Sequence, residues 1–196
     1  VSGTPLKATI STKKVIVSRV LNAKNGANNL VLKNTKGNTI YVRLLNTGIL
    51  PVGQEKTIQS DVSASISYKN RKGEIISVEK TKQGTEFIAT ITIRNQRNEL
   101  VNNIALTQII PSGFEIVNTR YTDYGSSTDN RADYIDIRDD RANYYFGLKA
   151  SETKTFTLLL NASYLGNYYM PGLQCEAMYD ATFITRTKGY WVQVLP

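Results

Sequence analysis

The sequence contains no histidine and only one cysteine among its 196 residues. Without histidine, the chain lacks the commonest general base, the Ser-His and Cys-His nucleophile pairs, and the usual imidazole metal ligand. A single thiol excludes an intrachain disulfide and any multi-thiolate zinc or iron–sulfur site. We therefore expect a protein that is not an enzyme, with no catalytic residue, no bound metal and no cofactor.

Long apolar runs are also missing, and residues 1–60 contain only one acidic residue. No run approaches the roughly 18–20 residues that span a bilayer, so we expect no membrane insertion. Residues 1–60 carry nine Lys or Arg against one acid, Glu55, whereas residues 61–196 carry fifteen of each sign. The whole net charge of +8 thus lies in the first third, which predicts a domain boundary near residue 60. The cations are scattered without interleaved aromatics, so we expect no nucleic-acid partner.

The pattern that is present is typical of β-structure. Apolar and polar side chains alternate in residues 38–45, 85–94 and 153–162, which are rich in β-branched and aromatic types. Shorter segments of the same kind are 14–21, 29–33, 62–68, 75–79, 99–109, 114–121, 142–148, 173–179 and 190–194. No stretch keeps a helical period over three turns. The sequence predicts an all-β fold of two β-sandwich units: residues 1–60 as a partial unit, and 61–196 as a complete antiparallel sandwich.

Glycines and short polar stretches mark the connections between these segments. At Gly73, Gly84, Gly113 and Gly189 we expect glycine to supply the positive φ of a turn.

Two clusters with possible chemistry have a simpler structural interpretation. Cys175 lies in an apolar strand segment with no neighbour to lower its pKa, which favours a packing role. The acidic tract 129–141 could suggest calcium, but arginines interleave with its carboxylates and no glycine follows the pattern. Salt-bridged hairpin strands fit the tract better.

Aromatic and methionine residues gather near the C-terminus. The group comprises Tyr164, Tyr168, Tyr169, Met170, Met178, Tyr179, Tyr190 and Trp191. Two interpretations stay open: cross-strand packing in the core, and an apolar contact surface for another domain.

Several ordered motifs resemble bacterial alpha-2-macroglobulins. Residues 109–116 (IIPSGFEI) resemble the family element LLPAGFEI, residues 134–141 (YIDIRDDR) its Y-x-D-x-R-D-D-R strand, and residues 176–180 (EAMYD) its E-A-M-Y-D element. The order and spacing match the last macroglobulin-like domain over residues 61–196. Residues 37–43 (GNTIYVR) are similar to a strand in the return half of the preceding CUB-like domain. The residues that carry the structural motifs are Pro111, Gly113, Phe114, Asp136, Arg138, Asp139, Asp140 and Arg141.

This resemblance implies a fragment of a protease trap, or protease inhibitor, of the bacterial cell envelope. Such proteins are periplasmic, or are tethered to the outer or inner membrane as lipoproteins. Cleavage of a bait region triggers a rearrangement, and in many members a Cys–Gln thioester then captures the protease. The resemblance implies that Met178 and Tyr179 pack over the thioester and shield it from water. The expected partners are the thioester domain of the same parent chain and, through the parent, target proteases.

The sequence departs from the family pattern in one respect and leaves other functions open. It contains no Cys-x-Glu-Gln thioester motif. The alternatives are a generic Ig-like module of a cell-surface adhesin, and a carbohydrate-binding accessory domain in which Trp191 stacks on a sugar.

Overall fold

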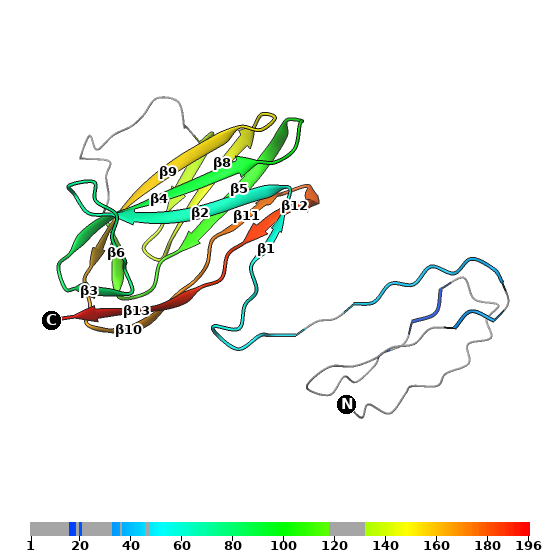
Figure 1. Ribbon diagram of the computed structural model, residues 1–196, viewed down its shortest axis with the longest axis horizontal. Helices are drawn as coiled ribbons and strands as arrows, with labels where there is room; N and C mark the ends of the chain where they lie inside the picture. Colours follow the sequence, from blue (N-terminus) through cyan, green and yellow to red (C-terminus); the bar gives the residue numbers. More distant parts are fainter. Residues whose placement is uncertain (1–15, 19, 21–32, 36, 46–47, 118–131) are drawn as a thin grey trace. The chain divides into compact units, whose positions relative to one another are not determined.

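The computed structural model describes residues 16–18, 20, 33–35, 37–45, 48–117 and 132–196 (Figure 1). The chain divides into two compact units, Val1–Gly48 and Ile49–Pro196. Each unit is described by itself below. Segment 49–57 and strand β1 belong to the second unit, although they precede the boundary that the charge pattern predicts. That domain assignment stays a prediction.

The described part of the first unit contains no strand and no helix. The strand expected over residues 38–45 is therefore wrong: Ile40, Val42 and Leu44 are all exposed there. Alternation shows which face a strand would bury, but a strand also needs a hydrogen-bonded neighbour. No described residue supplies one to this segment. The strands expected over 14–21 and 29–33 lie largely outside the described residues.

The second unit is all-β and is made of three sheets. Its strands are β1 Ile58–Ser60, β2 Val62–Lys69, β3 Lys80–Lys82, β4 Glu86–Asn95, β5 Val101–Ile109, β6 Phe114–Ile116, β7 Tyr134–Ile137, β8 Arg141–Leu148, β9 Thr153–Ala162, β10 Gly166–Met170, β11 Gln174–Ala177, β12 Asp180–Arg186 and β13 Tyr190–Leu195. The sheet orders are β1-β12-β11-β5-β8-β7, β2-β4-β9-β6 and β10-β13-β3. All pairs are antiparallel except β13 with β3. The all-β prediction is confirmed.

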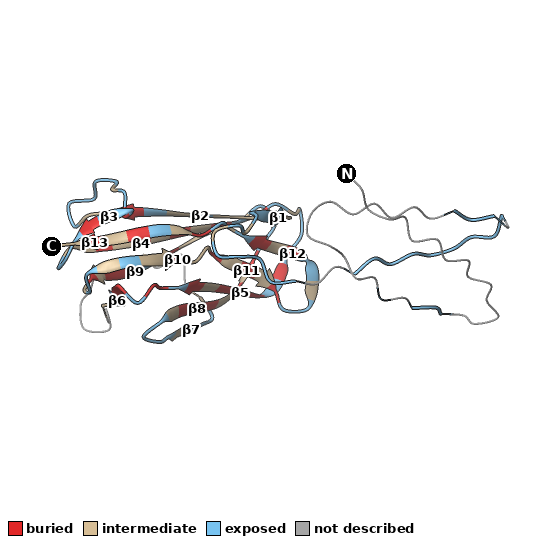
Figure 2. Ribbon diagram, turned by 90° about the horizontal axis from the view of Figure 1, so that it is seen from below, coloured by how far each residue is buried: buried red, intermediate tan, exposed pale blue. Residues whose placement is uncertain are grey.

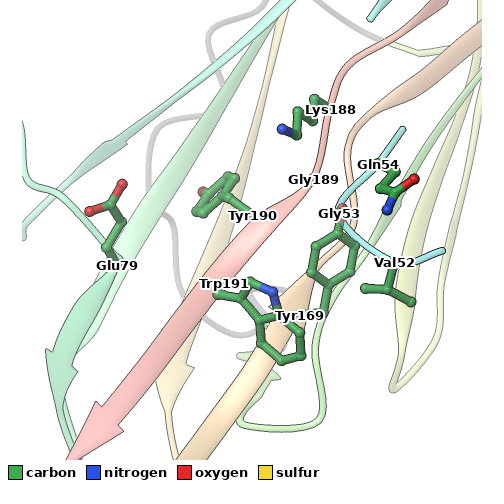
Figure 3. A pocket seen from close by; sticks show the side chains of 9 residues that line it. All are labelled: Val52, Gly53, Gln54, Glu79, Tyr169, Lys188, Gly189, Tyr190 and Trp191. Atoms are coloured by element: carbon green, nitrogen blue, oxygen red, sulfur yellow. The ribbon is translucent and has the colours of Figure 1, made fainter. Parts of the chain in front are cut away.

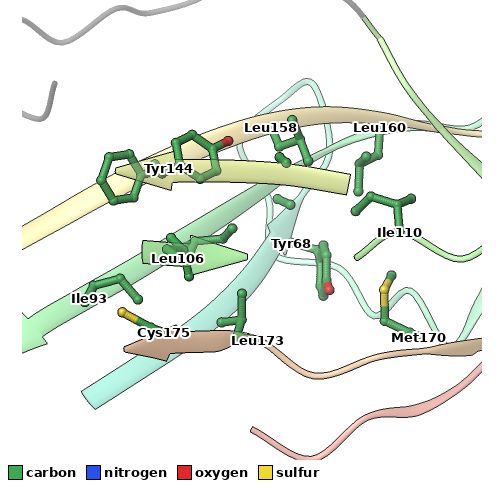
Figure 4. Packing of buried hydrophobic residues seen from close by; sticks show 14 of the residues in the cluster. Tyr68, Ile93, Leu106, Ile110, Tyr144, Leu158, Leu160, Met170, Leu173 and Cys175 are labelled. Atoms are coloured by element: carbon green, nitrogen blue, oxygen red, sulfur yellow. The ribbon is translucent and has the colours of Figure 1, made fainter. Parts of the chain in front are cut away.

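The core lies between the inner faces of the strands, where buried residues alternate with exposed ones (Figure 2). Strand β4 shows why these residues form a strand, since Phe87, Ala89, Ile91 and Ile93 are fully buried and the residues between them face outward. Aromatic rings join the two larger sheets: Tyr144 on β8 stacks on Phe156 of β9 at 4.6 Å between ring centroids. Leu106, Cys175 and Leu173 extend the same apolar cluster (Figure 4).

The glycines confirm one part of the turn prediction and correct another. Gly73 and Gly84 have φ of 86° and 79°, as expected for turns. Gly113 and Gly189 have no positive φ and are needed for space instead. A Cβ at Gly113 would lie 2.3 Å from the Tyr168 ring, and one at Gly189 would lie 2.6 Å from a backbone carbonyl oxygen.

The chain changes sheet at Asp61. Strand β1 pairs with β12 in the six-stranded sheet, whereas β2 pairs with β4 in the four-stranded sheet. Asp61, the single residue between them, has φ of 60°, a left-handed conformation that is uncommon for a residue other than glycine. The corner from β1 to β2 therefore lies where both sheets approach each other.

Among the described residues the structure has no helix of the length and hydrophobicity that a membrane crossing needs.

Candidate functional site

The β11–β12 hairpin presents Met178 and Tyr179 at its tip. The strand expected over 173–179 ends earlier, at Ala177, and the two residues form the turn that leads into Asp180. Met178 is 56% exposed and Tyr179 is 84% exposed. Neither residue has a positive φ, and the β11–β12 register shifts beside the turn. The tip therefore projects an apolar and an aromatic side chain from an irregular, bulged hairpin.

The backbone of the tip is tied to the neighbouring strand β5. The Met178 N–H donates to the carbonyl oxygen of Asn103 at 2.9 Å. Asn103 has φ of 55° and sits where the β5 register shifts against β8. The tip is thus an exposed surface on a hydrogen-bonded support, which limits the entropy it would lose on docking.

Asp180 fixes the residue after the tip. Its Oδ1 accepts from the Thr182 hydroxyl at 2.6 Å and from the Thr182 N–H at 2.9 Å. Its Oδ2 accepts from Arg97 at 2.6 Å. The Thr182 hydroxyl, then Arg97 and the Thr182 N–H, lower the pKa of Asp180 to about 2. Asp180 is therefore ionised at neutral pH.

The charged motif residues of the β7–β8 hairpin other than Asp139 form ion pairs. Asp136 accepts from Arg138 at 3.0 Å and from Asn143 at 3.2 Å. Arg141 binds both carboxylate oxygens of Asp140, at 2.6 and 3.0 Å, and these bonds lower the pKa of Asp140. The salt-bridged hairpin interpretation is confirmed for the described part of the tract. Asp139 is exposed in the connecting turn, and residues 129–131 lie outside the described residues.

The other motif residues have structural surroundings. Pro111 and Gly113 are buried, and Phe114 begins β6 with its ring 5.1 Å from that of Phe87. The Gly113 carbonyl oxygen accepts two backbone hydrogen bonds, from Ser163 and Tyr164. Strand β6 thus belongs to the four-stranded sheet, whereas the hairpin that carries Met178 and Tyr179 belongs to the six-stranded sheet.

A second surface is a groove of about 680 Å³ beside β13 (Figure 3). Its lining is Val52, Gly53, Gln54, Glu79, Tyr169, Lys188, Gly189, Tyr190 and Trp191. Tyr169 and Trp191 lie side by side, with ring centroids 5.5 Å apart in an edge-to-face arrangement. The Tyr169 hydroxyl donates to Glu55 at 2.5 Å, which lowers the pKa of that carboxyl group. Such a groove offers ring faces and polar groups to a ligand, and the carbohydrate-binding alternative stays a prediction.

The C-terminal aromatic group divides between the two interpretations left open by the sequence. Met170 is buried, and Tyr168 and Tyr190 pack against the core. The exposed members are Tyr164, Met178, Tyr179 and Trp191.

Cys175 is a packing residue, as expected. It is fully buried on β11, and burial raises the pKa of its thiol to about 12. It is therefore no nucleophile at neutral pH.

Sequence reasoning missed Arg97, which binds Asp180 and Thr182 beside the tip. Arg97 lies in a polar connection with no motif and no periodicity, so only the folded chain brings it to the hairpin. The described residues form no group of three or more metal-ligating side chains.

The geometry defines an all-β sandwich unit that projects a Met-Tyr hairpin tip. Residues 55–181 match the family of the bacterial alpha-2-macroglobulin MG10 domain. The chain belongs to this family. It is 26% identical over 186 residues to an alpha-2-macroglobulin of Rickettsia conorii. The aligned region covers 92% of this chain and 10% of that protein. It is also 26% identical over 163 residues to an alpha-2-macroglobulin homolog of Yersinia pestis. That aligned region covers 71% of this chain and 8% of the homolog.

Solved structures show the same fold. Native alpha-2-macroglobulin of Escherichia coli superposes with a TM-score of 0.67 at 16% identity, over 75% of this chain and 10% of that one. Salmonella alpha-2-macroglobulin reacted with methylamine superposes with a TM-score of 0.64 at 17% identity, over 72% of this chain and 10% of that one. The chain spans about a tenth of the length of these relatives.

Proposed function

We propose that this chain is the non-catalytic, docking part of a bacterial protease trap, and that its Met178–Tyr179 tip covers a thioester on another domain of the parent chain. The observation that carries the proposal is the tip itself. An exposed methionine and an exposed tyrosine on a hydrogen-bonded turn are the residue types that are enriched at interface cores. They gain free energy when a partner removes them from water.

The chemistry of a thioester explains why such a cover is useful. A thioester is an activated acyl group that water hydrolyses, so an apolar lid that excludes water prolongs its life. The family match over residues 55–181 includes the Met-Tyr pair, and residues 176–180 (EAMYD) resemble the family's E-A-M-Y-D element. One solved relative carries the description "reacted with methylamine", and others are described as activated by trypsin or by elastase.

Release of the cover is a population shift in this proposal. The tip holds the docked arrangement, and bait cleavage by a protease favours a different arrangement in which the tip and the thioester separate. The single thiol of the chain takes no part in this proposal, because it is buried and burial raises its pKa. Target proteases and a location in the periplasm or cell envelope, with or without a lipid anchor, belong to the same proposal.

Substitution of the tip in the full-length parent tests the proposal. The Met178→Ala, Tyr179→Ala double variant should release a thiol with methylamine about tenfold faster or more, the change that corresponds to roughly 1.4 kcal/mol of lost docking free energy. Thiol release is measured with a chromogenic disulfide. Tyr134→Ala is the matched control, since Tyr134 is also largely exposed but lies on the edge strand β7.

Two results would contradict the proposal. One is equal release from the double variant and the parent. The other is the absence of any released thiol from either protein.

A further inference from the structure

Arg97 lies at one end of the sandwich, in the connection from β4 to β5. Figure 1 shows this connection, the β8–β9 connection and the β11–β12 hairpin at the same end. The connection is built on Asn95, which is fully buried. The Asn95 amide donates to the carbonyl oxygens of Glu99 and Lys149 at 2.8 and 2.9 Å. Its Oδ1 accepts from the Arg97 N–H at 2.9 Å. The buried Asn95 side chain therefore holds the backbone of Arg97 in place.

The guanidinium group of Arg97 uses all three of its nitrogens. Nε donates to Oδ2 of Asp61 at 2.9 Å, and Nη1 donates to Oδ2 of Asp180 at 2.6 Å. Nη2 donates to the Thr182 hydroxyl at 2.7 Å. The group also lies over the Phe183 ring, with Cζ 5.3 Å from the ring centroid. The Arg97 side chain is only 19% exposed, so it is held on several sides.

These partners come from different parts of the fold. Asp180 and Thr182 are the first and third residues of β12, directly after the tip. Asp61 is the corner at which the chain leaves the six-stranded sheet for the four-stranded sheet. Arg97 follows β4 of the four-stranded sheet. A single side chain thus links the corner from β1 to β2 with the strand that carries the tip.

Isolated surface ion pairs contribute little to stability, so one pair would not support a role. Arg97 differs because its planar fork donates hydrogen bonds to two carboxylates and a hydroxyl at once, with Glu99 Oε1 a further 3.5 Å from Nη1, and is largely shielded from solvent. Lysine is a point charge on a flexible stem and cannot reproduce three directed bonds from a fixed plane. The arrangement therefore depends on the shape of arginine as well as on its charge.

We propose that Arg97 is a positioning residue that holds the Met178–Tyr179 tip in its projecting geometry and couples it to the corner from β1 to β2. Loss of either carboxylate contact loosens the tip, although Asp61 itself does not belong to the hairpin. The effect of Arg97 on docking rests on the proposed function, since a loosened tip would cover the thioester less well. Its structural content, order at the tip, can be measured on this chain alone.

The two methionines provide the measurement. Met178 is 56% exposed at the tip, whereas Met170 is 1% exposed in the core. Labelling the methionine methyl groups of the full 196-residue chain with ¹³C gives one reporter for each region. Amide exchange of Met178, whose N–H is bonded to Asn103, gives a second readout.

The test compares Arg97→Lys and Asp61→Asn with Arg71→Lys. Arg71 pairs with Glu86 and lies beyond the opposite end of β2, so it is a matched control. We expect both test variants to shift the Met178 methyl signal and to speed Met178 amide exchange by roughly tenfold, with Met170 unchanged. Arg71→Lys should leave both readouts at their original values.

Each outcome decides the proposal. If Met178 keeps its signal and exchange rate in Arg97→Lys and Asp61→Asn, Arg97 does not position the tip. If Met170 changes together with Met178 in both variants, Arg97 acts on the whole fold, and the positioning role is again wrong. These results are independent of thiol release in the parent, so failure of this inference is distinguishable from failure of the thioester cover.

Discussion

Asp180 shows how one carboxylate joins local geometry to an exposed surface. It directly follows Tyr179 and accepts hydrogen bonds from both Thr182 and Arg97. Each bond favours the ionised form, which is why its pKa falls to about 2. The charge of Asp180 thus stabilises the contacts of the residue that directly follows the tip.

The first prediction concerns the pH dependence of this residue. The pKa of Asp180 is about 2 in the folded chain against a usual value of 3.8, so ionisation favours folding. Its contribution is present above about pH 4 and is lost as the pH falls from about 4 to about 2. Asp180→Asn should therefore reduce the free energy of unfolding at pH 7, and the difference from the original chain should shrink over that interval.

Denaturant unfolding at a series of pH values measures this difference. Asp139→Asn is a suitable control, because Asp139 is an exposed turn residue for which we find no hydrogen bond among the described residues. A constant difference between the Asp180→Asn variant and the original chain from pH 7 to pH 2 would rule the linkage out.

At this scale the sequence indicated the exposed tip only through a family motif. Met178 and Tyr179 have no periodicity that marks them as exposed, and the alternating pattern extended the strand through them. Arg97 was missed because its partners lie 36 and 83 positions away in sequence. The sequence predicted that position 113 requires glycine, but the predicted reason was a positive φ. The structure shows that glycine is needed there because the Tyr168 ring packs against it.

At the scale of elements, the connection from β10 to β11 crosses the turn from β12 to β13 at very short range. A Cβ on Gly172 would lie 1.8 Å from the carbonyl oxygen of Thr187. The two segments are also joined by hydrogen bonds. The Thr187 N–H donates to the carbonyl oxygen of Leu173 at 2.9 Å, and the Leu173 N–H donates to the Thr187 hydroxyl at 2.8 Å. No side chain fits between them.

The second prediction is that Gly172→Ala destabilises the sandwich by about 1–3 kcal/mol or more, because a backbone carbonyl group must move to admit the methyl group. Denaturant unfolding measures the loss. Gly147→Ala is the matched control. A Cβ there would meet the side-chain oxygen of Asn102 at 2.9 Å, and this side chain can rotate away. Equal losses in both variants would mean that the crossing does not constrain the fold.

Alternation predicted the long central strands well. Strands β4 and β9 lie within one residue of the expected ranges, because each is paired on both sides and buries one full face. The short strands β1 and β3 have no such signal. Strand β3 has lysines at both ends and gains its place only by pairing with β13, more than a hundred residues later. The opposite error occurred at residues 38–45, which have the alternating pattern but no partner strand among the described residues.

At the scale of the whole molecule, segment 49–57 and β1 belong to the sandwich. Glu55 accepts from Tyr169, Thr57 accepts from the Lys188 N–H at 3.2 Å, and β1 pairs with β12. The buried hydrophobic residues of the described chain all fall within Ile49–Pro196. This unit therefore holds its own core.

The third prediction follows from that division. The fragment Ile49–Pro196 should fold alone and unfold cooperatively. A fragment that begins at Asp61 should be less stable by about 1–3 kcal/mol, since it loses a strand and several hydrogen bonds worth about 1 kcal/mol each. Circular dichroism and denaturant unfolding of both fragments provide the measurement. Equal stability would place the boundary where the charge pattern predicts it.

The pairing of β1 with β12 also sets an order on biosynthesis. Ile58 pairs with Arg186, and Lys80 of β3 pairs with Gln193 of β13. Contacts between residues so far apart form slowly, because a long loop must close before they stabilise anything. During synthesis β1 therefore waits for β12, and β3 waits for β13. Until β12 emerges, the edge of β11 stays unpaired, and until β13 emerges, β3 and β10 lack the strand that joins them, so these edges stay open to chaperones and to neighbouring chains.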